Sequence, residues 1–259
     1  MIPWSRIAAQ LYTVRRLIQT PEEIAVTLKK IRAIGYPAVQ VSGMGPIPEK
    51  ELKKILDGEG LICCATHEPP ERILDSPGEV AERLRQLDCR HVAYPSPRGV
   101  NVAEEQEVRR LAQRLDHAGQ VLRAAGITLS YHNHAFELYR HGHRTMLEMI
   151  FELTRPEHLA AELDTYWIQA GGGDPVTWCR NMKGRLPLLH LKDYGVKTDG
   201  TPEFREIGSG NLDWPAIAQA ATEAGCEWWI VEQDETPGDP LASLAKSWNF
   251  LSGNLRSDS

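Results

Sequence analysis

Carboxylate and histidine side chains recur at four places in the second half of the chain, each time after a short apolar run. The four segments are 131–137, 162–167, 189–193 and 231–235. Carboxylate oxygens combined with an imidazole nitrogen are the ligands of Mn²⁺, Mg²⁺, Co²⁺ or Zn²⁺ in open catalytic sites. No cysteine lies in these segments, which argues against a structural zinc site built from thiolates. The pattern therefore predicts one bound divalent metal ion.

One ligand from each segment gives the expected metal site, which consists of Glu137, Asp164, His190 and Glu232. A single histidine or aspartate after a strand is often a helix cap or a surface residue, but four on neighbouring strands point to a shared site. Glu137 is the least firmly placed ligand, because His132 and His134 lie closer to the preceding strand.

Further side chains in the same half of the chain could take part in catalysis. Lys192 lies two residues after His190 and therefore on the same face of an extended strand. It could stabilise an enolate oxygen or pair with Glu232. Either Glu232 or Glu137 could act as a base, and His132 or His134 could act as an acid, since an imidazole titrates near neutral pH.

Four more residues are candidates for contact with a substrate. Gln10 and Tyr12 could donate hydrogen bonds to a hydroxyl or could instead plug the barrel. His67 could contact the substrate or be an ordinary loop histidine. Trp167 could pack against the face of a sugar or belong to the core.

Short apolar strands alternate with amphipathic helices along the whole chain. The expected strands are 6–12, 38–42, 61–66, 91–94, 127–132, 159–164, 186–191 and 228–232, and the expected helices are 21–34, 48–56, 76–87, 102–125, 144–153, 175–182, 213–224 and 240–251. Such alternation predicts a parallel sheet, and eight units predict an α/β fold of one (β/α)8 TIM barrel over residues 1–259. An open doubly wound sheet is the alternative. It is disfavoured because the run 171–173 lacks the GxGxxG spacing of a dinucleotide fingerprint.

In such a barrel the carboxyl ends of all strands meet at one rim, where catalytic residues lie. The helix at 21–34 shows the expected punctuation, with Thr20 as N-cap, Pro21 at the first helical position and Gly35 as the stop. The four polar segments follow the fifth to eighth strands, so their side chains should converge near the barrel axis.

Composition limits the classes of partner. The chain has 259 residues with a net charge of −6, which argues against a nucleic-acid binder, since such proteins need a basic face. The odd number of cysteines, five, predicts reduced thiols rather than a disulfide framework. No signal-peptide core and no apolar run of membrane-spanning length are visible, so a cytoplasmic protein without a membrane partner is expected.

Taken together, these residues resemble the sugar phosphate isomerases/epimerases, which are xylose isomerase-like barrels. The resemblance runs over nearly the full length. It rests on QLYTVR at 10–15, YHNHAFE at 131–137, LDT at 163–165, HLKD at 190–193, GSGNLDW at 208–214 and VE at 231–232.

The resemblance implies a Glu, Asp, His and Glu metal site, which maps directly onto Asp164, His190 and Glu232. In many relatives the first Glu lies on the fifth strand itself, near the position of His132 here. This sequence departs from that pattern. Either Glu137 reaches in from the loop, or His132 or His134 replaces the glutamate.

The family includes epimerases, ketol isomerases, inosose and dehydroshikimate dehydratases and AP endonucleases, so the resemblance does not select the reaction. The leading hypothesis is an isomerase or epimerase that acts on a sugar or keto-polyol through an enediolate, with the metal polarising the carbonyl and an adjacent hydroxyl. A dehydratase would share this intermediate.

Two further alternatives stay open. An AP endonuclease-like phosphodiesterase would need more metal ligands and a basic face, and a non-catalytic sugar-binding barrel would not retain a metal. No organic cofactor is required by the sequence. Barrels of this type often pair through their helices, so a homodimer is the default expectation for the assembly.

Overall fold

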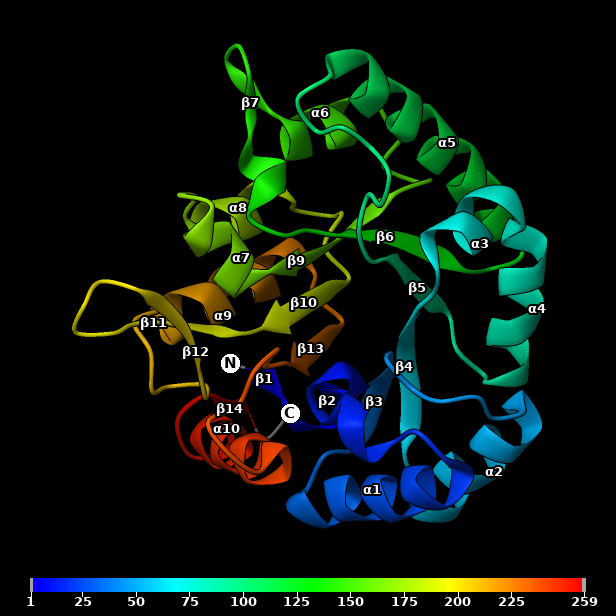
Figure 1. Ribbon diagram of the computed structural model, residues 1–259, viewed down its shortest axis with the longest axis vertical. Coiled ribbons are helices and arrows are strands. Elements are labelled where there is room, and N and C mark those ends of the chain that lie inside the picture. Colours follow the sequence, from blue (N-terminus) through cyan, green and yellow to red (C-terminus); the bar gives the residue numbers. More distant parts are fainter. Residues whose placement is uncertain (1, 258–259) are drawn as a thin grey trace.

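Eight parallel strands close into a barrel in the computed structural model, which describes residues 2–257 (Figure 1). Around the barrel the order is β10 (Leu188–Leu191), β13 (Trp228–Val231), β2 (Ile7–Gln10), β3 (Ala38–Val41), β4 (Ile62–His67), β5 (His91–Tyr94), β6 (Thr128–His132) and β9 (Ala160–Asp164). The predicted (β/α)8 barrel is thereby confirmed.

A ring of helices covers the outside of the strands (Figure 1). They are α1 (Pro21–Ile34), α2 (Glu49–Glu59), α3 (Pro70–Asp75), α4 (Pro77–Gln86), α5 (Glu105–Ala124), α6 (Met146–Glu152), α7 (Thr165–Ala170), α8 (Pro175–Asn181), α9 (Trp214–Ala224) and α10 (Pro240–Asn254). The main core lies between strands and helices, which explains why the strands are apolar on both faces. Helix α1 begins with the expected Thr20 cap, which forms a capping box with Glu23.

The barrel interior is built in layers because side chains alternate along each strand. Its lower part is a small apolar cluster of Ala8, Ala38, Cys64, Ala65, Leu188, Trp228 and Ile230. Two residues further along, the same strand faces carry Gln10, Gln40, His190 and Glu232, all of them buried. The apolar layer therefore supports a polar layer at the carboxyl ends of the strands.

Several short elements were not expected from the sequence. They are α3, α7, the hairpin of β11 (Asp193–Val196) with β12 (Pro202–Arg205), the hairpin of β7 (Arg140–His141) with β8 (Arg144–Thr145), and the pair of β1 (Ile2–Pro3) with β14 (Arg256–Ser257). Each is too short to show a periodic pattern. The expected strand 6–12 is also corrected: it ends at Gln10, and Tyr12 lies in a 3-10 segment, Leu11–Leu17.

Two further expectations concern cysteines and membranes. All five cysteines are free thiols, and four of them are buried. Among residues 2–257, no helix combines the length and the apolar character that a membrane crossing requires.

Candidate metal centre

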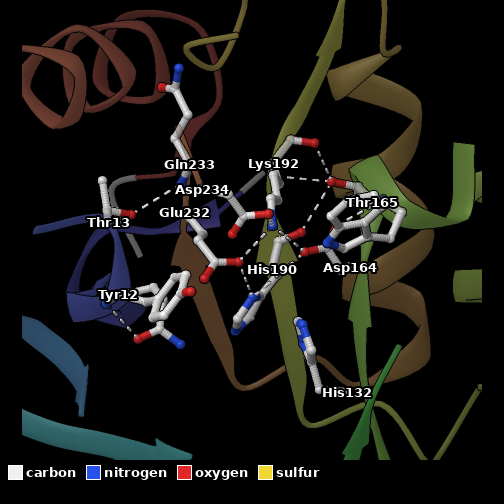
Figure 2. Close-up of polar contacts among 12 residues, drawn as sticks. Tyr12, Thr13, His132, Asp164, Thr165, His190, Lys192, Glu232, Gln233 and Asp234 are labelled. Atoms are coloured by element: carbon white, nitrogen blue, oxygen red, sulfur yellow. Dashed lines mark hydrogen bonds and ion pairs between the residues drawn. The ribbon is translucent and has the colours of Figure 1, made fainter. Parts of the chain in front are cut away.

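The motif LDT at 163–165 lies where β9 ends, at the carboxyl-terminal rim of the barrel, and links this end to the end of β10. One carboxylate oxygen of Asp164, Oδ1, accepts a hydrogen bond from the backbone of Trp167 at 2.9 Å and so caps α7. The hydroxyl of Thr165 donates to the carbonyl of Lys192 at 2.8 Å and accepts from the amide of Lys192 at 3.0 Å. These bonds hold the end of β10 against the start of α7 and leave the second oxygen of Asp164 facing the barrel axis (Figure 2).

Four buried side chains from four consecutive strands meet at this rim. His132, Asp164, His190 and Glu232 each offer one ligand atom, and these atoms lie within 4.8 Å of one another. His190 Nδ1 is 3.0 Å from Glu232 Oε2 and 3.8 Å from Asp164 Oδ2. Asp164 Oδ2 and His132 Nδ1 are buried and make no well-aligned hydrogen bond, although Lys192 Nζ lies 3.3 Å from the first and Glu162 Oε2 lies 3.2 Å from the second. Because buried polar atoms are normally satisfied, these two suit a bound cation.

Lys192 supplies the positive charge at the centre of this group (Figure 2). Its Nζ lies 2.7 Å from Asp234 Oδ2, 3.0 Å from Glu232 Oε2 and 3.3 Å from Asp164 Oδ2. Three carboxylates therefore surround one ammonium group. The carboxylates outnumber the ammonium group, so the buried cluster is consistent with a site for a cation.

A second layer lies beneath the first and is organised by Glu162. Its Oε2 lies 2.5 Å from His67 Nε2, 3.2 Å from His132 Nδ1 and 3.4 Å from His190 Nε2. Its Oε1 accepts a hydrogen bond from Gln40 at 2.5 Å, and Gln40 Oε1 lies 2.7 Å from His190 Nε2. These partners orient the imidazole of His190 so that Nδ1 faces Asp164 and Glu232, as outer-shell groups do for metal-binding histidines.

The two rim imidazoles have opposite pKa shifts. Burial lowers the pKa of His132 well below its usual value, and the nearby His190 adds to this effect. Burial alone would also lower the pKa of His190, but the carboxylates of Glu162 and Glu232 raise it to about 10. His132 is thus the neutral imidazole of the pair, with a lone pair free for a cation, whereas His190 would have to release a proton to bind one.

The rim carboxylates also differ. Burial raises the pKa of Asp164 to about 6, against the opposing effect of Lys192. Burial would raise the pKa of Glu232 as well, but Lys192 and His190 hold it well below its usual value. Glu232 is closer to the Lys192 ammonium than Asp164 is, which explains the difference.

The structure does not bring the expected ligand Glu137 to this group. Its carboxylate is buried in a 3-10 turn, where it accepts hydrogen bonds from the hydroxyl of Tyr131 at 3.1 Å and the amide of His134 at 2.7 Å. His132 takes the fifth-strand place instead. His134 lines the cavity above it, and its ring stacks on Phe136 at 5.3 Å.

A cavity of about 900 Å³ opens above the cluster, and three of the four expected substrate contacts line it: Tyr12, His67 and Trp167. The fourth, Gln10, is fully buried below, where it donates to Gln40 at 2.8 Å. Trp167 and Phe204 flank Lys192, each with its ring centroid 5.2 Å from Nζ.

Several of these residues were missed in the sequence. Glu162 precedes Asp164 by two residues, so strand alternation already places both on one face. Gln40 is a polar residue inside the apolar strand 38–42, which is a comparable signal. Phe204 and Asp234 carry no such signal, because their positions depend on loop conformation.

Comparison with known proteins accords with this architecture. The family model described as xylose isomerase-like TIM barrel matches residues 28–252. The chain belongs to the xylose isomerase-like TIM barrel family.

Individual members of the xylose isomerase-like family are distant in sequence. An inosose dehydratase from Lacticaseibacillus casei is 26% identical over 173 residues, which cover 58% of this chain and 56% of that protein. The match thus spans about half the length of that relative. The rhizopine catabolism protein MocC of Rhizobium meliloti is 25% identical and is matched over 83% of this chain and 76% of its own.

Among solved structures, a sugar phosphate isomerase/epimerase from Parabacteroides distasonis superposes with a TM-score of 0.79. The superposition covers 96% of this chain and 94% of the other at 23% identity. At this identity the likeness concerns the fold alone.

Proposed function

We propose that this protein is a divalent-metal-dependent enzyme that moves a proton next to the carbonyl of a sugar or keto-polyol, as an isomerase or epimerase. The observation that carries the proposal is the convergence of His132, Asp164, His190 and Glu232 from four consecutive strands below an open cavity. These four residues would hold the metal ion. When bound, such an ion acts as a Lewis acid toward a carbonyl and a neighbouring hydroxyl.

Two groups that line the cavity would carry the proton transfer. Glu232 enters the cavity from β13, and His134 borders it from the loop after β6. A carboxylate on one side can accept the proton, while an imidazole on the other side can return it. Epimerisation requires such a pair, because the proton leaves from one face and returns to the other.

Lys192 and the aromatic side chains would position the substrate. The ammonium group of Lys192 lines the cavity beside Glu232 and can donate a hydrogen bond to a developing oxyanion. Trp167 and Phe204 border the same cavity and present rings on which the carbon face of a polyol can pack. Tyr12 and His67 complete the wall with groups that can hydrogen-bond hydroxyls.

Dehydration of a keto-polyol is the second candidate, and the similarity to inosose dehydratases favours it. Proton abstraction by Glu232 would be the same, but the neighbouring hydroxyl would leave as water. His134 would protonate the leaving oxygen, and Lys192 would donate a hydrogen bond to it, since both line the cavity.

The proposal is tested with Asp164→Asn and Glu232→Gln, which keep the shape of each side chain. Each purified variant is incubated with Mn²⁺, desalted and analysed for bound metal, and is then assayed against keto-sugars, inososes and dehydroshikimate. We expect the wild type to retain about one ion per chain, and each variant to lose the ion and at least ~100-fold of its turnover.

Glu235→Gln is the matched control, because Glu235 is an exposed carboxylate at the same rim that pairs with Arg15. It should behave as the wild type. Unchanged metal content and turnover in both site variants would refute the proposed function. The product formed by the wild type distinguishes isomerisation and epimerisation from dehydration.

A further inference from the structure

The cavity above the candidate metal ligands is also lined by four arginines. Two of them form close ion pairs with carboxylates, and two do not. Arg15 is bound to Glu235 at 2.8 Å and to the carbonyl of Asp234 at 2.8 Å. Arg83 pairs with the buried Glu68 and with Glu49 at 3.2 Å. These two guanidinium groups are held by acidic partners within the protein.

Arg72 and Arg98 are not neutralised in this way. Arg72 has only a distant contact, 3.8 Å, with Glu68, whose carboxylate is already engaged by Arg83. Within residues 2–257, no carboxylate lies within ion-pair distance of Arg98, and its side chain makes no hydrogen bond. It also borders a smaller cavity of about 300 Å³, where Arg114 does have an acidic partner, Asp75, at 2.5 Å.

The backbone around the unpaired arginines is fixed by prolines. Arg98 follows Pro97, its amide donates to the carbonyl of Ser96 at 2.9 Å, and the carbonyl of Pro97 accepts from Val100 at 3.1 Å. Arg72 lies in the first turns of α3, which begins after Pro69 at Pro70. Because proline restricts the backbone, both side chains project from defined positions rather than from loose loops.

The barrel closure places this pair across the mouth from Lys192 and Glu232, whereas His132 lies on β6, the neighbour of β5. Arg72 follows β4 and Arg98 follows β5, whereas Lys192 and Glu232 follow β10 and β13, four places around the eight-strand order (Figure 1). The cavity thus has an acidic side and an opposite side with unpaired positive charge. Both guanidinium groups are exposed to solvent, and a neutral polyol would leave them without an acidic partner.

We propose that Arg72 and Arg98 form a subsite for an anionic oxygen group, a carboxylate or a phosphate, on the side of the cavity mouth that faces Lys192 and Glu232. This inference rests on the proposed function for what happens at the other end of the substrate. A guanidinium group binds both anions through paired N–H donors, which gives orientation as well as charge complementarity. The substrate class is therefore a sugar acid or a sugar phosphate rather than an uncharged sugar.

The test measures binding by calorimetry to the Mn²⁺-loaded full-length protein. Three probes are compared: D-fructose, D-fructose 6-phosphate and 5-keto-D-gluconate. We expect at least one anionic probe to bind about tenfold or more tightly than fructose at 50 mM salt, and the advantage to shrink at 300 mM salt. The preferred anion identifies phosphate or carboxylate as the natural group.

Variants then locate the subsite. Arg98→Ala and Arg72→Ala should each reduce the anionic preference several-fold, and the double variant should bind all three probes alike. Arg110→Ala is the control, because Arg110 borders only the smaller cavity; its preference should match that of the wild type. Equal binding of the three probes by the wild type, no binding of either anion at millimolar concentration, or a preference that survives in the double variant would overturn the subsite.

Failure of the metal proposal gives a different result. Asp164→Asn should abolish turnover but keep the anionic preference, because Asp164 makes no ion pair with either arginine. Loss of metal retention in the wild type, combined with intact anion binding, would refute the proposed function and leave the subsite standing.

Discussion

Replacement of Asp193 by asparagine should destabilise the loop at 206–214, which follows the β11–β12 hairpin. Asp193 is fully buried and lies next to Lys192 in the chain. Its carboxylate accepts five hydrogen bonds: Oδ2 from the amides of Gly208 at 2.8 Å and Gly210 at 3.0 Å and from the indole of Trp214 at 2.9 Å, and Oδ1 from the amides of Tyr194 at 2.9 Å and Leu212 at 3.4 Å. One side chain thus organises the segment 206–214.

The cost follows from the acceptors that an amide retains. An asparagine NH₂ group cannot accept a hydrogen bond. It takes the place either of Oδ2, which has three donors, or of Oδ1, which has two. The second orientation is less costly, and it leaves the amides of Tyr194 and Leu212 without an acceptor. A buried unsatisfied donor costs about 1–3 kcal/mol, and one of these bonds is already long, so we expect a loss of about 3 kcal/mol. For a chain of this size that corresponds to roughly 6–12 °C in Tm.

Thermal unfolding followed by circular dichroism measures this effect. Asp213→Asn is the matched control, since Asp213 caps α9 through a bond to Ala216 at 3.1 Å and asparagine is an equally good N-cap. The control should unfold within about 2 °C of the wild type. If Asp193→Asn unfolds no earlier than the control, the interpretation of Asp193 as the organiser of this loop is wrong.

Three other substitutions test separate parts of the structure. Glu162→Gln removes the carboxylate shared by the buried imidazoles and should weaken Mn²⁺ binding about 10- to 100-fold in equilibrium dialysis; unchanged affinity would contradict its orienting role. Burial would raise the pKa of Glu206, but its own backbone amide and Lys246 lower it. At pH values above the usual glutamate pKa, the wild type should therefore be more stable than Glu206→Gln by about 1 kcal/mol. That difference should vanish as the pH falls through the lowered native pKa, and a pH series of Tm values checks it. Gly119→Ala would press a Cβ into the backbone carbonyl oxygen of His158 and should cost about 3 kcal/mol or more in urea unfolding, whereas Gly78→Ala, with open space around it, should be neutral.

Local sequence patterns were sufficient for the main elements of the barrel. Capping residues such as Thr20 and helix stops such as Gly35 act through neighbouring backbone groups, so their effect is visible along the chain. The short hairpins and α3 were not visible, because elements of two to six residues form through contacts with the rest of the fold rather than through periodicity.

The candidate site was predictable where the ligand belongs to a strand. Asp164, His190 and Glu232 follow apolar runs directly, and the pleat carries their side chains toward the barrel axis. Glu137 belongs to a turn, and there the outcome depends on competition between partners. The hydroxyl of Tyr131 and the amide of His134 hold its carboxylate away from the group.

The sequence by itself determined the alternation of strands and helices and the residues that end each strand, because both depend on local periodicity. Only the tertiary structure decided which of those residues meet. Barrel closure and strand register set the depth of each side chain: they pair His190 with Asp164, His132 with Glu162 and Gln10 with Gln40. They also set Arg72 and Arg98 across the mouth from Lys192, since opposite strands face each other only after the sheet has closed.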